Sequence, residues 1–223
     1  MKLQIDPTQS HQRSDDAPAR QRIVEAAFAA FSESSYSGVS TLDIATRAQV
    51  SKRDLYALVG NKAALLVACV AARAKRFEMP AELAMPDSPE SFTETLAALG
   101  TRLLREISDP TVIGVFRLAI AEAVRTPKVA RILDSVGRNA SRLALQSFME
   151  RARDAGLLRG RPDDMAEQFW GMLWGQLMVS LLLGVAERPS QRAMTRRARD
   201  AAESFARLHL GSNDCEPLHR ARK

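Results

Sequence analysis

Ser40 to Lys62 reads STLDIATRAQVSKRDLYALVGNK, and this stretch decides the fold because it contains two helix-start signals only eleven residues apart. Ser40 is followed three residues later by Asp43, and Ser51 is followed three residues later by Asp54. Each pair has the form of a capping box, in which the Ser hydroxyl accepts a backbone N–H and the carboxylate reaches back. We therefore expect two short helices joined by a tight turn.

The second predicted helix keeps polar side chains on its outer face. The inward faces of the two helices are expected to be their apolar residues, Leu42, Ile44, Ala45, Ala48, Leu55 and Leu58. Lys52, Arg53, Asp54 and Tyr56 then remain outward. Cations at the N-terminal end of a second helix are typical of a helix-turn-helix, whose recognition helix contacts base edges and phosphates there.

The chain resembles the DNA-binding domain of TetR/AcrR-family transcriptional regulators over about residues 17 to 77. The matching positions are Ile23 to Ala27, Phe31, Ser40 to Ala45, Ala48, Val50 to Lys52, Leu55-Tyr56 and Asn61 to Leu66. The resemblance implies a DNA-binding surface made of Ser40, Thr41, Ser51, Lys52, Arg53, Asp54, Tyr56 and Lys62. Gln49 stands where the family usually has Gly, which predicts a non-glycine residue at positive φ, at a cost of about 1 kcal/mol.

Lys62 is expected in the first turn of a further helix that Asn61 caps. The helix dipole disfavours a cation at that end, so its presence hints at an external anion, and a DNA phosphate would serve. A solvated surface lysine is the plainer alternative. The resemblance favours phosphate contact for Lys62, and also for Ser40, Thr41 and Tyr56, while Lys52 and Arg53 would reach phosphates or base edges.

The composition predicts an all-α protein. Ala, Arg and Leu are the most frequent of the 223 residues, aromatic residues are few, and β-branched runs are absent. The net charge of +6 suits a polyanionic partner, but residues 1–79 and the remainder each carry +3 of it, so basicity alone is weak support for DNA. Cys69 and Cys215 fit no metal or redox spacing, which favours a reduced cytoplasmic protein without a cofactor or metal.

Prolines and changes of composition along the chain indicate its domain organisation. Residues 1–16 are polar and are expected to form a disordered arm, with no apolar run of a secretory signal. A DNA-binding domain is predicted at 17–77, and prolines near residues 80 to 89 mark its boundary. A larger helical domain for ligand binding and dimerisation is predicted at 78–211, followed by a flexible tail at 212–223. Its expected helices are 88–108, 111–125, 127–155, 163–187 and 189–210.

The most apolar stretch, Phe169 to Ala186, is about long enough to span a bilayer. Gln176 and Ser180 interrupt it, and the basic cluster that follows would place the DNA-binding domain outside the cell, so a buried helix is favoured over a membrane span. Its glycine face is expected to meet the same helix of a second subunit. The residues assigned to that dimer interface are Gly171, Gly175 and Met178.

No catalytic constellation is recognisable in the sequence, and no enzyme activity is expected. The resemblance implies instead a small-molecule pocket in the second domain, where Trp and Met suit an apolar or aromatic ligand. The candidate lining residues are Phe92, Leu96, Phe116, Ile120, Phe148, Phe169, Trp170, Leu173, Trp174 and Leu177. Large apolar residues that recur along one face of a helix usually fill the protein core, and this alternative to a ligand pocket stays open.

The reading that unites these features is a homodimeric transcriptional regulator and repressor. Two recognition helices would bind one palindromic operator of double-stranded DNA, and a small ligand in the second domain would release it. Two alternatives belong to other classes. One is a helical enzyme or ligand-binding protein with a vestigial helix-turn-helix, and the other is a membrane-anchored regulator.

Overall fold

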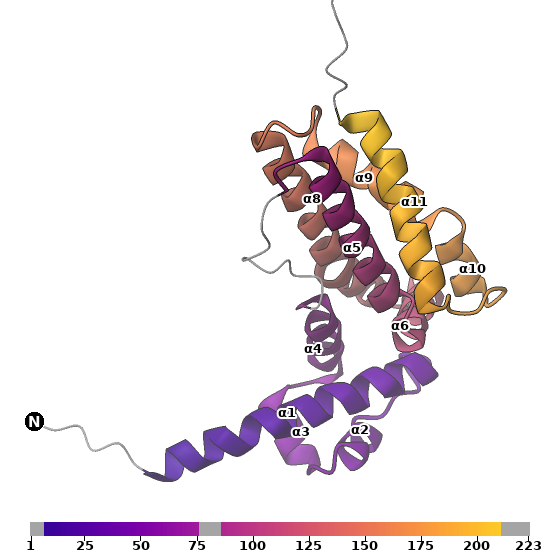
Figure 1. The fold of residues 1–223 in the computed structure, drawn as a ribbon. Helices are drawn as coiled ribbons and strands as arrows, with labels where there is room; N and C mark the ends of the chain where they lie inside the picture. The colour runs from indigo at the N-terminus through magenta and orange to yellow at the C-terminus, as the bar shows by residue number, and fades with distance from the viewer. Residues whose placement is uncertain (1–6, 76–85, 211–223) are drawn as a thin grey trace, which may run out of the picture. The chain divides into compact units, whose positions relative to one another are not determined.

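The computed structural model describes residues 7–75 and 86–210, with side chains from Asp16 onward, and these ranges are built of helices (Figure 1). Their only β-type pairing is an isolated bridge between Leu158 and Leu210. In chain order the elements are α1 (Pro7–Glu33), α2 (Thr41–Arg47), α3 (Lys52–Leu58), α4 (Lys62–Ala74), α5 (Pro89–Ile107), α6 (Pro110–Glu122), α7 (Pro127–Ile132), the π-helix η2 (Leu133–Arg138), α8 (Asn139–Asp154), α9 (Pro162–Trp174), α10 (Leu177–Leu183) and α11 (Gln191–His209).

The chain divides into two compact units. Unit 1 comprises Met1–Glu78, Arg105–Ser141 and Gln176–Arg188, and unit 2 comprises Met79–Leu104, Arg142–Gly175 and Pro189–Lys223. Unit 1 therefore holds the predicted helix-turn-helix together with α6, α7, η2 and α10. The predicted boundary between a DNA-binding domain (17–77) and a ligand-binding and dimerisation domain (78–211) concerns function, and it stays a prediction.

Unit 1 has one apolar core, to which α1, α4 and α6 contribute the largest share. Its fully buried members include Ile23, Phe31, Ile44, Leu55, Leu65 and Leu66. The helices α2 and α3 pack on α1, so the two short helices bury their apolar faces against a long one. A Cβ at Gly114 would lie 2.8 Å from the backbone oxygen of Ser32, so α6 approaches α1 more closely than a side chain would allow.

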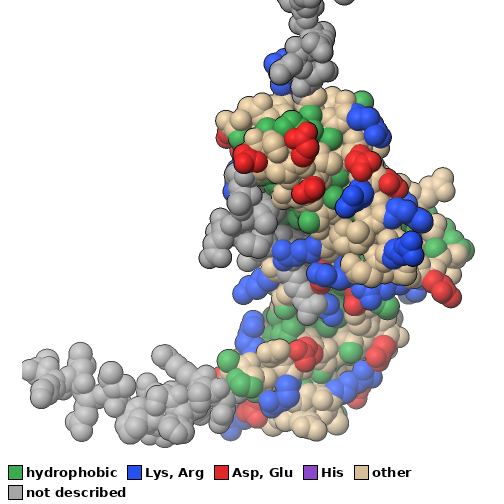
Figure 2. All heavy atoms as spheres, in the orientation of Figure 1, with side chains coloured by type: hydrophobic (Ala, Val, Ile, Leu, Met, Phe, Trp, Pro, Cys, Tyr) green, Lys and Arg blue, Asp and Glu red, His purple; other side chains and the backbone are tan. Residues whose placement is uncertain are grey.

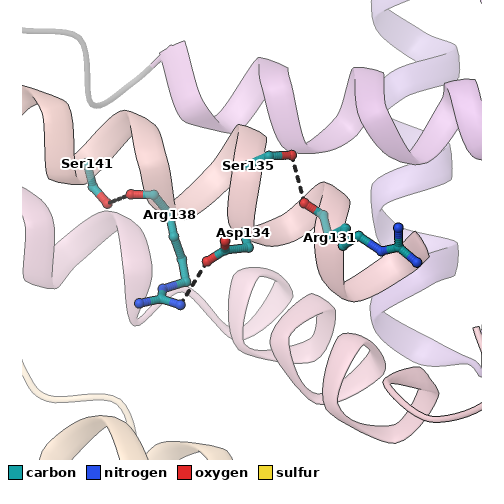
Figure 3. A network of polar contacts seen from close by, with 5 residues as sticks. All are labelled: Arg131, Asp134, Ser135, Arg138 and Ser141. Atoms are coloured by element: carbon teal, nitrogen blue, oxygen red, sulfur yellow. Dashed lines mark hydrogen bonds and ion pairs between the residues drawn. The ribbon is translucent and has the colours of Figure 1, made fainter. Parts of the chain in front are cut away.

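The predicted helix 127–155 is one run with a wider turn inside it. The run consists of α7, η2 and α8, and η2 and α7 pack against α4. Figure 3 shows the polar contacts along this run: Ser135 donates to the Arg131 carbonyl at 2.7 Å, and Ser141 to the Arg138 carbonyl at 2.9 Å. Arg138 also pairs with Asp134 at 2.8 Å. The exposed Arg138–Asp134 pair is worth little by itself, and the packing of η2 on α4 matters more.

Unit 2 has a core of stacked aromatic rings. Phe92 of α5 stacks on Phe148 of α8 with centroids 5.3 Å apart, and Phe169 of α9 meets Phe205 of α11 edge-on at 5.8 Å. All four side chains are fully buried. A Cβ at Gly100 would lie 3.1–3.2 Å from side chains of α9 and α11, so the glycine allows α5 to pack closely on both.

The first helix begins earlier than expected. The chain is helical from Pro7, so part of the predicted disordered arm is α1, and Pro18 lies inside the helix rather than in its first turn. No glycine occurs between Pro7 and Pro18, so the sequence there contains no strong local stop for a helix that packing fixes further along. Residues 1–6 of the predicted arm and the predicted tail at 212–223 lie outside the described residues.

The predicted single helix 163–187 is wrong, because the chain breaks at Gly175. This glycine has φ 45° and ψ −126°, and it separates α9 from α10. A second glycine, Gly184, ends α10 in the left-handed region at φ 73°. The apolar pattern runs through both helices without interruption, which is why periodicity did not reveal the break.

Among the described residues, no single helix has the length and apolar character needed to cross a membrane. One bent pair, α3 with α4, meets that test by length and composition only, with a 60° bend between its helices.

Candidate nucleic-acid interface

The start of α3 is fixed by the predicted cap. Ser51 accepts a hydrogen bond from the Asp54 backbone N–H at 3.0 Å and donates its hydroxyl to the Asp54 carboxylate at 2.6 Å. The carboxylate thus binds the cap's hydroxyl, and the expected return bond to the cap's N–H is replaced. At α2, Ser40 accepts from the Leu42 N–H at 3.1 Å. Asn61 caps α4 by accepting from the Ala64 N–H at 3.0 Å, as expected.

The turn between α2 and α3 has the predicted strain. Gln49 has φ 55°, and it is the one non-glycine residue at positive φ in the described ranges. The turn is closed by backbone bonds, including Val50 N–H to the Ala45 carbonyl at 3.0 Å. A long-range contact supports it, because Arg22 of α1 donates from Nε to the Ala48 carbonyl at 3.1 Å. Sequence reasoning missed Arg22, since no local signal pairs it with a residue 26 positions away.

The outer face of α3 is polar and solvent-exposed. Only Leu55 of this helix is buried, while Lys52, Arg53 and Asp54 are exposed and Tyr56 is 45% exposed. Neither Lys52 nor Arg53 has a carboxylate partner in the part of the chain that the structure describes. Two unpaired cations at a helix N-terminal end are chemically suited to phosphate oxygens and to the acceptor edge of guanine.

Thr41 and Tyr56 come together across the two helices. Their hydroxyl oxygens lie 3.4 Å apart, so the first turn of α2 and the middle of α3 present one polar edge. Leu42 was expected to point inward but is 56% exposed, because it lies two residues before Ile44 and so on the other side of α2. An exposed leucine therefore stands beside this polar edge.

Lys62 is held by the protein itself. Its ammonium donates to the Ser37 carbonyl at 3.3 Å and lies 4.8 Å from the centre of the Tyr36 ring. Burial lowers the pKa of Lys62, and the Glu122 carboxylate opposes that shift. A phosphate contact by Lys62 would thus add to an existing set of contacts.

On the face drawn in Figure 2, Lys and Arg side chains lie in several separate groups with Asp and Glu near them. Arg47 at the end of α2 is paired with Glu33 at 2.8 Å, so it is not available in the way that Arg53 is.

The ten predicted pocket residues do not form one lining within one unit. Phe92, Leu96, Phe148, Phe169, Trp170, Leu173 and Trp174 belong to unit 2, whereas Phe116, Ile120 and Leu177 belong to unit 1. Ile120 is 61% exposed, and the phenylalanines of unit 2 fill its stacked core. A cavity of about 630 Å³ in unit 2 is lined by other residues, of α5 and α11. The ligand site stays a prediction.

The residues assigned to the dimer interface differ in their surroundings. Gly171 lies within α9, is exposed, and a Cβ there would have no neighbour within 4 Å. Gly175 sits at the break, and a Cβ there would lie 3.0 Å from an Arg197 nitrogen. The two glycines therefore do not continue one helical face, and Met178 follows in α10, where it is half-buried.

Comparison with protein families assigns both parts of the chain. Residues 23–69 match the model of the bacterial regulatory proteins of the tetR family. Residues 94–209, just over half of the chain, match the C-terminal domain of AefR-like transcriptional repressors. The chain belongs to the TetR family of transcriptional regulators. It is accordingly a DNA-binding regulator with a helix-turn-helix domain and a C-terminal helical domain, which confirms the predicted all-α class.

Solved structures of TetR-family proteins share this fold. A Mesorhizobium loti protein assigned to the TetR family is 26% identical, with 88% of this chain and 98% of that chain covered at a TM-score of 0.71. A TetR transcriptional regulator from Agrobacterium tumefaciens is 25% identical over 86% and 94%, at 0.73. The flavonoid-responsive regulator FrrA is 25% identical over 86% and 97%, at 0.66. A comparison with curated protein sequences found no match.

Proposed function

We propose that this TetR-family protein is a cytoplasmic repressor that binds a palindromic operator as a homodimer and leaves it when a small apolar ligand binds. The observation that supports operator recognition is the exposed first turn of α3, where Lys52 and Arg53 form no ion pair within the described residues. Thr41 and Tyr56 extend the same surface toward α2. An Arg reaching guanine and neighbouring hydroxyls on phosphates would set both base preference and register.

Arg53→Ala should relax base preference at one operator position, at a cost of about 1–3 kcal/mol in specific binding. Lys62→Ala should instead weaken binding to all sequences and reduce the salt slope by about 1. The operator is first selected from random DNA, and each variant is then titrated at several salt concentrations.

Arg192→Ala, an exposed cation in α11, is the matched control and should leave operator affinity unchanged. Unchanged affinity in both the Arg53 and the Lys62 variant would remove these residues from the DNA surface. A wild-type protein that selects no sequence would favour the alternative of a helical ligand-binding protein or enzyme.

The dimer proposal rests on apolar side chains that unit 1 leaves in solvent near α10. Val179 is 57% exposed, Leu183 72% and Val185 75%. Val179→Arg should therefore give monomers with weakened operator binding, because one recognition helix makes only half of the contacts. Sedimentation compares it with Ala155→Arg, which is exposed at the end of α8, and an unchanged dimer would place the interface elsewhere.

The ligand proposal rests on the two tryptophans. The Trp170 and Trp174 rings lie 5.8 Å apart, and the indole N–H of Trp174 is buried without an acceptor among the described residues. A buried donor left unpaired costs about 1–3 kcal/mol, and a ligand with an oxygen acceptor would recover this. FrrA is named as flavonoid-responsive, and a flavonoid is an aromatic molecule with such oxygens.

Titration of flavonoids should quench tryptophan fluorescence and lower operator affinity. By linkage, a compound that weakens DNA binding tenfold must itself bind the DNA complex tenfold more weakly. Trp174→Phe, which keeps a ring and removes the N–H, should weaken ligand binding and leave operator binding intact. If a broad panel of apolar compounds leaves operator binding unchanged, the ligand switch is wrong and the DNA-binding dimer remains.

A further inference from the structure

A groove of about 600 Å³ lies within unit 1, along α1 and α4 and beside the start of α6. Its size falls in the range of small-molecule sites. Small side chains create the hollow, because Ala29 of α1 and Ala72 of α4 line it beside the ring of Phe28. Cys69 lines the inner end, where the residue is 1% exposed and its thiol donates to the Val24 carbonyl at 3.3 Å.

Two guanidinium groups face this apolar hollow. Arg73 of α4 stacks over the Phe28 ring, with Cζ 4.7 Å from the ring centre. Arg20 lines the groove from α1, two helical turns before Phe28 and so on the same face. Within residues 7–75 and 86–210, neither guanidinium is paired with a carboxylate in an ion pair. Arg73 is therefore fixed in place by a ring that cannot occupy its N–H donors.

The carboxylates near the groove offset only part of this positive charge. The groove lining holds two arginines and one carboxylate, that of Glu25, which accepts a hydrogen bond from the Gln21 amide at 3.0 Å. Asp109 caps α6 through Thr111, and although burial raises its pKa, the Thr111 bonds and the nearby Arg73 and Arg188 lower it overall. Burial raises the pKa of Cys69 to about 12, so the inner end is neutral.

We propose that this groove binds a small organic anion with an apolar body, the class to which medium-chain carboxylates belong. Its carboxylate lies between Arg20 and Arg73, because arginine forms charge-assisted, bidentate hydrogen bonds with that group. Its hydrocarbon part covers Phe28, Ala29 and Ala72 and removes their apolar surface from water. The site lies in the unit that contains the helix-turn-helix, and it shares no residue with the tryptophan site proposed above.

Octanoate is the probe, and 1-octanol is its neutral counterpart. Titration calorimetry on the full-length protein gives the affinity for each compound, and variants of the groove residues show whether octanoate binds there. We expect octanoate to bind, and 1-octanol to bind much more weakly. Circular dichroism checks that each variant is folded.

Arg73→Gln and Arg20→Gln should each raise the dissociation constant of octanoate by about tenfold or more, the effect of losing one charged hydrogen-bond donor. Ala72→Phe, at an exposed position, should fill the groove and abolish octanoate binding even if an arginine variant misfolds. Arg192→Gln in unit 2 should behave as wild type. Absence of binding at millimolar octanoate, equal binding of 1-octanol, or unchanged octanoate affinity in both arginine variants would overturn the proposal.

Discussion

The α2–α3 and α9–α10 segments each join two neighbouring helices through a tight turn, but different residues form the two turns. In each, a tight turn at positive φ separates two helices, at Gln49 (φ 55°) in the first and at Gly175 (φ 45°) in the second. In each, an arginine from another helix donates to the carbonyls that the first helix leaves free. Arg22 serves the Ala48 carbonyl at 3.1 Å, and Arg197 serves those of Leu173 and Trp174 at 2.6 and 2.7 Å.

The two segments differ in how the second helix begins. After Gln49, Ser51 caps α3 through its side chain, whereas the residue before α10, Gln176, makes no side-chain cap. The α2–α3 turn therefore depends on local polar groups, and the α9–α10 break depends on backbone freedom at one glycine together with a distant arginine. A ψ of −126° at positive φ is open essentially only to glycine, whereas the left-handed helical region accepts glutamine at moderate cost.

Gly175→Ala should give the largest effect. The added methyl forces an L-residue into a region that only glycine occupies easily, and it meets an Arg197 nitrogen at 3.0 Å, which threatens both carbonyl bonds. We expect the free energy of unfolding to fall by about 2–3 kcal/mol. Denaturant titration at fixed protein concentration measures it, since dimerisation would shift the apparent stability.

Gly171→Ala, one turn earlier, is the matched control for that measurement. Gly171 is helical, and a Cβ there meets no atom within 4 Å. Replacing helical glycine by alanine should stabilise the protein by up to about 1 kcal/mol. Equal destabilisation by both substitutions would show that the break at Gly175 is not what distinguishes them.

Ser51→Ala should give an intermediate and mostly local effect. It removes the hydroxyl that accepts the Asp54 N–H and donates to the Asp54 carboxylate. The loss of an N-cap costs about 1 kcal/mol, and α3 has a single buried residue, Leu55, to hold it in place. Amide hydrogen exchange should therefore accelerate in α3 more than in α4, whose own cap at Asn61 is intact. Uniform acceleration across unit 1 would mean that α3 does not open on its own.

These two segments also show what the sequence could predict. The caps at Ser51 and Asn61 were predictable because each depends on residues within three positions of one another, whereas the positive φ at Gln49 followed from the resemblance to a family that usually has Gly there. The break at Gly175 was not, since Gly also occurs in packed helices and the apolar pattern continues past it. Arg22 and Arg197 were missed because their acceptors lie 26, 24 and 23 positions away.

The candidate site residues also differ in how well the sequence alone predicts their positions. Lys52 and Arg53 were placed correctly on an exposed face by helical periodicity, but Leu42 was not, because α2 is too short for its apolar stripe to be read reliably. Whether a buried phenylalanine fills a core or lines a cavity depends on the shapes of side chains from several helices. Phe92 and Phe148 illustrate this, since only the structure reveals that their rings stack.

Gln49→Gly should give the smallest effect, and its sign tests the comparison of the two turns. Relief of the left-handed strain favours the folded state by about 1–2 kcal/mol, while the greater freedom of glycine in the unfolded chain offsets about 0.4–1 kcal/mol of this. The free energy of unfolding should therefore rise by about 0.5 kcal/mol. Gln49 is exposed and its side chain has no hydrogen bond among the described contacts, so few other terms enter. Paired denaturant titrations with an unchanged m-value measure the difference, and Gln49→Val, which is β-branched, should instead destabilise. A loss of stability in the glycine variant would show that the Gln49 side chain, and not backbone strain, determines this turn.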